Sequence, residues 1–87
     1  MANQGWTLEP SAEAAILLPW LIDESVSNEA KDQVIAFLAA LLRDPFRPHL
    51  ADHETGVYSV ETVPQTDVGL VWILNVETRQ VVLAFIG

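Results

Sequence analysis

Two histidines come closest to a pattern that could do chemistry. His49 and His53 stand four residues apart, with Asp52 and Glu54 beside them. On a helix this spacing presents two imidazoles to one metal ion, as in HExxH zinc sites. Here Pro48 directly precedes the first histidine, so we expect a loop, and no glutamate holds the position of the general base. We therefore interpret both as solvated loop histidines and predict no metal site and no cofactor.

Other residues capable of acid–base or nucleophilic chemistry have simpler explanations. Asp23 and Glu24 are adjacent, so their carboxylates point in different directions on a helix, and we interpret them as charges of a connector. Ser25 and Ser27 lack the nearby histidine that would activate a hydroxyl, and capping of a helix explains them. If the chain is nevertheless an enzyme, its candidate catalytic residues are Arg43, Arg47, His49 and His53. We favour a function other than catalysis.

The chain is acidic and apolar at the same time. It holds 12 acidic and 4 basic side chains, for a formal net charge of −8, yet 51% of its residues are hydrophobic. The four cations, Lys31, Arg43, Arg47 and Arg79, are too few and too scattered for a phosphate-binding patch, so we expect no direct binding of nucleic acid. The apolar excess favours a surface buried against a partner. The alternative is an ordinary compact domain with an acidic surface.

The length of the chain, 87 residues, predicts a single domain, 1–87. Without cysteine, no disulfide or thiolate metal site can brace it. The first residues show neither the basic nor the apolar segment of a signal peptide. No apolar run reaches the roughly 18–20 residues of a membrane span. We expect a cytoplasmic protein without membrane contact.

The first half of the chain has the pattern of a short strand followed by two helices. Residues 6–9 alternate apolar and polar side chains, as strands do, and Ser11 is a plausible N-cap for a helix that starts at Ala12. Pro19 kinks or splits this helix before Ile22, or lies in the first turn of a short second piece. Ser25 or Ser27 caps the next helix, which runs to about Arg43. Its apolar stripe consists of Ala30, Val34, Phe37, Leu38, Leu41 and Leu42.

The second half, after an expected loop over 46–55, has three strand-like runs. They cover 57–63, 68–76 and 81–86, and the short turns between them predict an antiparallel meander. Gly69 is interpreted as a bulge or a close approach. The predicted fold class is therefore α+β: a short N-terminal strand, two helices, and a three-stranded antiparallel meander.

The last two strand-like runs are apolar on both faces. In an antiparallel sheet with one wet face, apolar and polar residues alternate, whereas here the helices can cover only one of two apolar faces. An uncovered apolar face is an aggregation hazard, so we predict a homodimer or a complex with a partner segment. The expected interface residues are Val71, Ile73, Val82, Ile86, Trp72 and Phe85.

The order of elements and several short motifs resemble the RelE/ParE toxin superfamily. They include an opening strand with an acidic helix start, a Leu-Pro between helices, a helix end of the type L-x-x-x-P, and strand motifs that contain G-x-Y and end in I-G. The segments that carry the likeness are 6–13, 18–19, 41–45, 56–60, 67–76 and 81–87. Ser59 and Leu70 stand where that family's strands often carry arginine, so the resemblance carries over no catalytic site.

The resemblance implies a toxin–antitoxin-type module that acts by protein–protein binding and has no nuclease activity. Its expected partner is either a second copy of the chain, in a homodimer, or an antitoxin-like protein segment. The first alternative is an active toxin of this superfamily, an mRNA interferase or gyrase inhibitor with an atypical site. The second alternative is an acidic immunity protein or nucleic-acid mimic, which the net charge of −8 favours.

Overall fold

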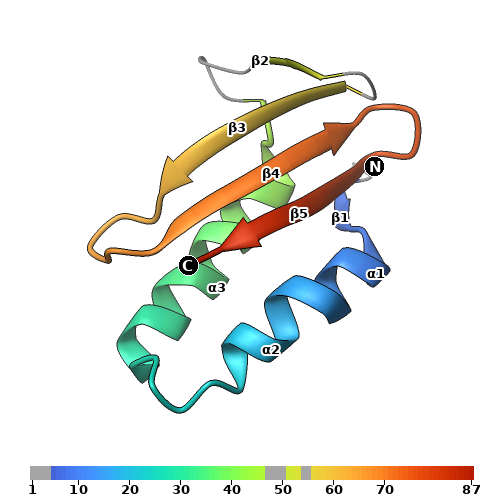
Figure 1. The fold of residues 1–87 in the computed structure, drawn as a ribbon. Coiled ribbons are helices and arrows are strands. Elements are labelled where there is room, and N and C mark those ends of the chain that lie inside the picture. Colours follow the sequence, from blue (N-terminus) through green and yellow to red (C-terminus); the bar gives the residue numbers. More distant parts are fainter. Residues whose placement is uncertain (1–4, 47–50, 54–55) are drawn as a thin grey trace.

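The protein folds as an α+β domain with two helical segments and a five-stranded mixed sheet. A computed structural model describes residues 5–46, 51–53 and 56–87. The elements are β1 (Thr7–Leu8), α1 (Pro10–Ala12), the π-helical η1 (Glu13–Leu17), α2 (Leu18–Leu21), α3 (Asn28–Arg43), β2 (Ala51–His53), β3 (Gly56–Thr62), β4 (Gly69–Asn75) and β5 (Gln80–Ile86). The strands are ordered β1-β5-β4-β3-β2. Figure 1 shows the sheet with the helices on one side of it.

The first helical segment runs without a break through α1, η1 and α2, and it begins at Pro10, two residues earlier than predicted. Its cap is Glu9, whose carboxylate accepts from the backbone N–H of Ala12 at 2.9 Å and of Ser11 at 3.2 Å. Pro10 occupies the first helical position, where its missing N–H costs nothing. Bonds from the Ser11 hydroxyl and then from these N–H groups hold the pKa of Glu9 below its usual range. The prediction that Ser11 caps this helix is therefore wrong.

Pro19 is the second residue of α2, directly after the π-helical turn. Proline in a regular α-helix lacks one donor and presses its ring against the carbonyl four residues back. In η1 the Leu18 N–H instead donates to the Glu13 carbonyl, five residues back, so the helix is wider just before the proline. Of the predicted alternatives, the one that places Pro19 in the first turn of a short second piece fits.

Helix α3 forms as predicted, with Ser27 as its cap. The Ser27 hydroxyl accepts from the Ala30 N–H at 3.1 Å, and Arg43 stands in the last turn, where a cation favours the negative end of the helix. The predicted apolar stripe faces the sheet. Val34, Leu38 and Leu41 are buried, and Phe37 and Leu42 are partly buried against the same core.

The sheet differs from the predicted three-stranded meander. β3, β4 and β5 are antiparallel neighbours in chain order, but β2 extends the sheet beyond β3, and β1 pairs with β5 in parallel. β2 lies inside the segment that was expected to be a loop. With three residues, two of them polar or ionisable, it has too short a pattern to be recognised from alternation. The sheet is mixed because the last strand of the chain, β5, runs antiparallel to β4 on one side and parallel to the first strand, β1, on the other.

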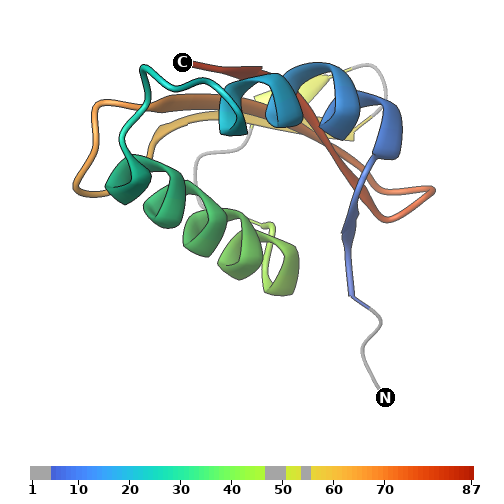
Figure 2. The same ribbon diagram turned by 90° about the horizontal axis from the view of Figure 1, so that it is seen from below.

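The hydrophobic core lies between the helices and one face of the sheet. It contains Leu17 and the α3 stripe from below, and from the sheet the side chains of Val63, Leu70, Trp72, Leu74, Val81 and Leu83. At one end the rings of Trp6 and Phe46 meet edge to face, with centroids 5.5 Å apart. Figure 2 shows the first helical segment alongside the sheet and α3 as a separate helix below it in that view, and the buried side chains of α3 belong to the core shared with the sheet. No described helix or strand covers the opposite face.

A bulge in β5 reverses the facing of its last residues. Val71 pairs with Phe85, but the next residue, Trp72, pairs with Leu83, which leaves Ala84 as an extra residue. Simple alternation from Val81 would direct Phe85 to the core and Ile86 away from it. Because the bulge adds one residue, Phe85 shares the uncovered face with Val71, and Ile86 packs against the core.

Candidate functional site: the uncovered face of the sheet

Six apolar or aromatic side chains form two rows across the uncovered face. The first row is Val60, Val71 and Phe85, and the second is Tyr58, Ile73 and Val82. The residues of each row are direct cross-strand partners from β3, β4 and β5. The rows are two residues apart along the strands, which corresponds to about 6.8 Å. The face is therefore one continuous apolar surface, and we call these six residues the uncovered face.

The outer strands of the uncovered face are the most exposed. Val60 is 62% exposed, Phe85 54% and Tyr58 36%, whereas Val71 and Ile73 of the central strand are half-buried between their neighbours. A single exposed valine needs no explanation, but a contiguous group of large apolar side chains marks interaction surfaces in soluble proteins.

The uncovered face has no charge among its described side chains. The other strand positions on this face whose side chains are described are uncharged too, namely Ala51, Gly56, Thr62, Gly69, Asn75 and Gln80, and the register also places the His53 position on this face. The carboxylates lie elsewhere. Glu61 and Asp52 face the helix side, and Asp67 and Glu77 stand in the turns at the two ends of β4. The chain has a net charge of −8, and the charged side chains that the structure describes thus lie outside this surface.

The structure divides the six predicted interface residues between the two faces. Val71, Ile73, Val82 and Phe85 are on the uncovered face. Trp72 is 0% exposed in the core, and its Nε1–H has no hydrogen-bond partner among the described atoms. Ile86 also faces the core because of the bulge. Trp72 therefore cannot contact a partner without unfolding, whereas Ile86 is only half-buried and lines the hollow beside Phe85.

Sequence reasoning missed Tyr58 and Val60 as members of this surface. Their alternation with Ser59 and Glu61 in the sequence placed them together on one face, but only the register of β3 against β4 shows that it is the uncovered one. Ser59 pairs with the buried Trp72 and is itself buried. That register depends on the whole sheet and has no local signal.

The candidate catalytic residues do not assemble into a site in the part of the chain that the structure describes. Arg43 is exposed at the end of α3. Arg47 and His49 lie outside the described residues, and of His53 only the backbone, in β2, is described. Among the described side chains no cluster of three or more His, Cys, Asp or Glu could hold a metal ion.

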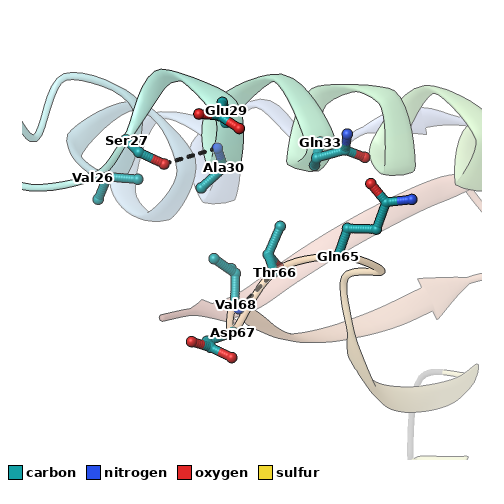
Figure 3. Close-up of a pocket in the computed structure, with 9 residues that line it drawn as sticks. All are labelled: Val26, Ser27, Glu29, Ala30, Gln33, Gln65, Thr66, Asp67 and Val68. Atoms are coloured by element: carbon teal, nitrogen blue, oxygen red, sulfur yellow. Dashed lines mark hydrogen bonds between the residues drawn. The ribbon is translucent and has the colours of Figure 1, made fainter.

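A hollow of about 450 Å³ lies between the start of α3 and the β3–β4 turn. Figure 3 shows Gln33 of α3 and Gln65 of the turn pointing towards each other across it. The start of α3 would favour an anion, but the ionisable residues that line the hollow are the acids Glu29 and Asp67. The Thr66 hydroxyl is used within the turn, where it donates to the Val63 carbonyl at 2.9 Å. This arrangement offers neither a nucleophile with a base nor a phosphate site.

A second hollow, of about 300 Å³, separates the first helical segment from the end of β5. It is lined mainly by Ala15, Ile16, Pro19, Trp20, Ala84 and Ile86, and it adjoins the uncovered face at Phe85. Its one charged lining residue is Asp23, whose pKa the Ser25 hydroxyl and N–H hold below the usual range. The hollow thus extends the apolar surface towards the helix and adds no catalytic group.

Comparison with known proteins gave no match to a family model, to a curated protein or to a solved structure. Within the described residues no helix has the length and apolar character needed to cross a membrane.

Proposed function

We propose that this chain acts by binding a protein partner over the uncovered face, as a RelE/ParE-like module of toxin–antitoxin type without nuclease activity of its own. The observation that carries the proposal is the pair of apolar rows, with Val60 and Phe85 more than half exposed. The resemblance in the sequence supports the toxin–antitoxin setting. The proposal includes a cytoplasmic location, which the sequence composition favours.

The best-fitting partner is an amphipathic helix of a second, short protein. The two rows are about 6.8 Å apart along the strands, close to the roughly 6 Å between residues i and i+4 of a helix. One apolar stripe of such a helix can therefore contact both rows when it lies along β4. Helix-in-groove recognition uses this spacing of anchors.

The charges at the two ends of β4 indicate where a partner helix would carry cations. Asp67 and Glu77 stand in the turns at opposite ends of β4. A helix that lies along β4 brings its two ends towards these carboxylates. Lys or Arg at both ends, with an uncharged apolar stripe between them, would complement this pattern. The acidic composition of the chain favours the same basic partner by long-range attraction.

Two buried residues support binding over RNA cleavage. Ser59 and Leu70 stand where the resemblance implies arginines, and they are 2% and 0% exposed on the helix-covered side. An ionic transition state in RNA cleavage needs cations at its developing charge. At these positions the chain has neither a cation nor a path to solvent.

The test is expression in a heterologous bacterium, alone and with the products of the genes that flank its own. We expect normal growth without a partner and a stoichiometric complex with one short flanking product. Growth arrest with cleavage of mRNA, abolished by Arg47→Ala or His49→Ala, would instead establish the active toxin. Stable expression with no complex from either flanking gene would count against the toxin–antitoxin setting.

A further inference from the structure

We infer that a second copy of this chain covers the uncovered face when no other partner is bound. The two copies would pack face to face, each burying Val60 and Phe85 against the other. The inference rests on the proposed function in one respect, since both place protein contacts on the same six residues. The inference differs from the proposed function in the molecule that occupies the face. An experiment can therefore contradict self-association and leave partner binding intact, or the reverse.

The distribution of charge permits this pairing although each chain carries −8. Two copies of a charged surface repel each other when they meet, but every strand position on this face whose side chain is described is uncharged. A second copy thus offers the apolar, uncharged counterpart that the centre of the face requires. The acidic groups meet only at the periphery, where solvent and salt screen them.

The size of the face indicates a weak pair. Three strands of seven residues give a footprint of roughly 14 Å by 24 Å, or about 340 Å² per copy, from standard strand spacings. Stable complexes bury about 800 Å² per partner. The hollow beside Phe85 adds some apolar area, but the footprint stays below that of a stable complex, so we expect a weak pair that dissociates readily. Such a pair would bury the uncovered face against non-specific contacts, and a partner that binds more tightly would displace the second copy.

Salt dependence separates a second copy from a basic partner. Two copies of net charge −8 repel each other through their peripheral acids, so added salt should strengthen self-association. A basic helix is attracted to the same acids, so salt should weaken that complex. The sign of the salt effect therefore reports the occupant.

Sedimentation equilibrium of the full chain tests the inference, at about 5–500 μM protein and in low and high salt. The variants are Val60→Glu and, as a control, Ile35→Glu. Ile35 is 51% exposed on α3, on the other side of the sheet, so both variants add one negative charge at an exposed apolar position. We expect a monomer–dimer equilibrium that salt strengthens, about tenfold weaker in Val60→Glu and within about twofold of wild type in Ile35→Glu.

Three results would overturn the inference. A monomer at every concentration and salt excludes the second copy, and the partner proposal stands if the flanking product still binds. A dimer that Ile35→Glu disrupts and Val60→Glu leaves intact uses the helix side. A dimer that salt weakens is held by charge and not by the uncovered face.

Discussion

Gly56 and Gly69 occupy opposite ends of the β3–β4 pair, and only one of them has to be glycine. A Cβ on Gly56 would overlap the backbone carbonyl oxygen of Leu74, whereas a Cβ on Gly69 would meet no atom within 4 Å. The sequence suggested a bulge or close approach at Gly69. The structure instead has the close approach at Gly56 and the bulge in β5. Close approach depends on which backbone lies opposite, which no single residue reveals.

At the residue scale we therefore predict opposite outcomes for two alanine substitutions. Gly56→Ala forces the central strand away and should lower the free energy of unfolding by about 3 kcal/mol. Gly69→Ala should leave it within about 1 kcal/mol of wild type, on the stabilising side, because alanine has less backbone entropy to lose. Urea denaturation followed by circular dichroism measures both. Equal losses would mean that the register between β3 and β4 is wrong.

At the element scale, periodicity predicted the helices better than the sheet. The stripe of α3 repeats over sixteen residues, so its buried members were identifiable from spacing. The facing of Phe85 and Ile86 was not, because one inserted residue reverses the alternation of a strand. β2 was missed because three residues carry no period. The start of the first helix was misplaced because Glu9 reaches over Pro10 to cap it.

Because of the bulge, we predict different losses of stability for two single-residue deletions in β5. Removing Ala84 should be tolerated, since Leu83, Phe85 and Ile86 then pair with Trp72, Val71 and Leu70 in an unbroken ladder with their present facing. Removing Val82 should cost about 3 kcal/mol or more, because it turns a core side chain of β5, Val81 or Leu83, to the uncovered side. Thermal and urea unfolding of the two deletions compare these costs. A loss for the Ala84 deletion as large as that for Val82 would show that the bulge itself is required.

At the scale of the whole molecule, two helical segments cover one face of a sheet that is apolar on both. The sequence predicted this imbalance from β4 and β5, and four of its six interface residues lie on the uncovered face. The sequence did not reveal that β3 adds Tyr58 and Val60 to the uncovered face or that Trp72 lies in the core. Both depend on how strands distant in the sequence are paired. The described acidic groups lie beside the apolar rows and not within them, so the proposed basic partner would meet both long-range attraction and an uncharged contact surface.

The central claim is that the protein acts through the uncovered face. Isothermal titration calorimetry of the flanking-gene product against wild type, Val60→Glu and Ile35→Glu tests it most directly. We predict that Val60→Glu weakens binding by about 2 kcal/mol or more, because it buries an unpaired charge in the contact, and that Ile35→Glu binds like wild type. Unchanged affinity for Val60→Glu, with its fold intact by circular dichroism, would contradict the account.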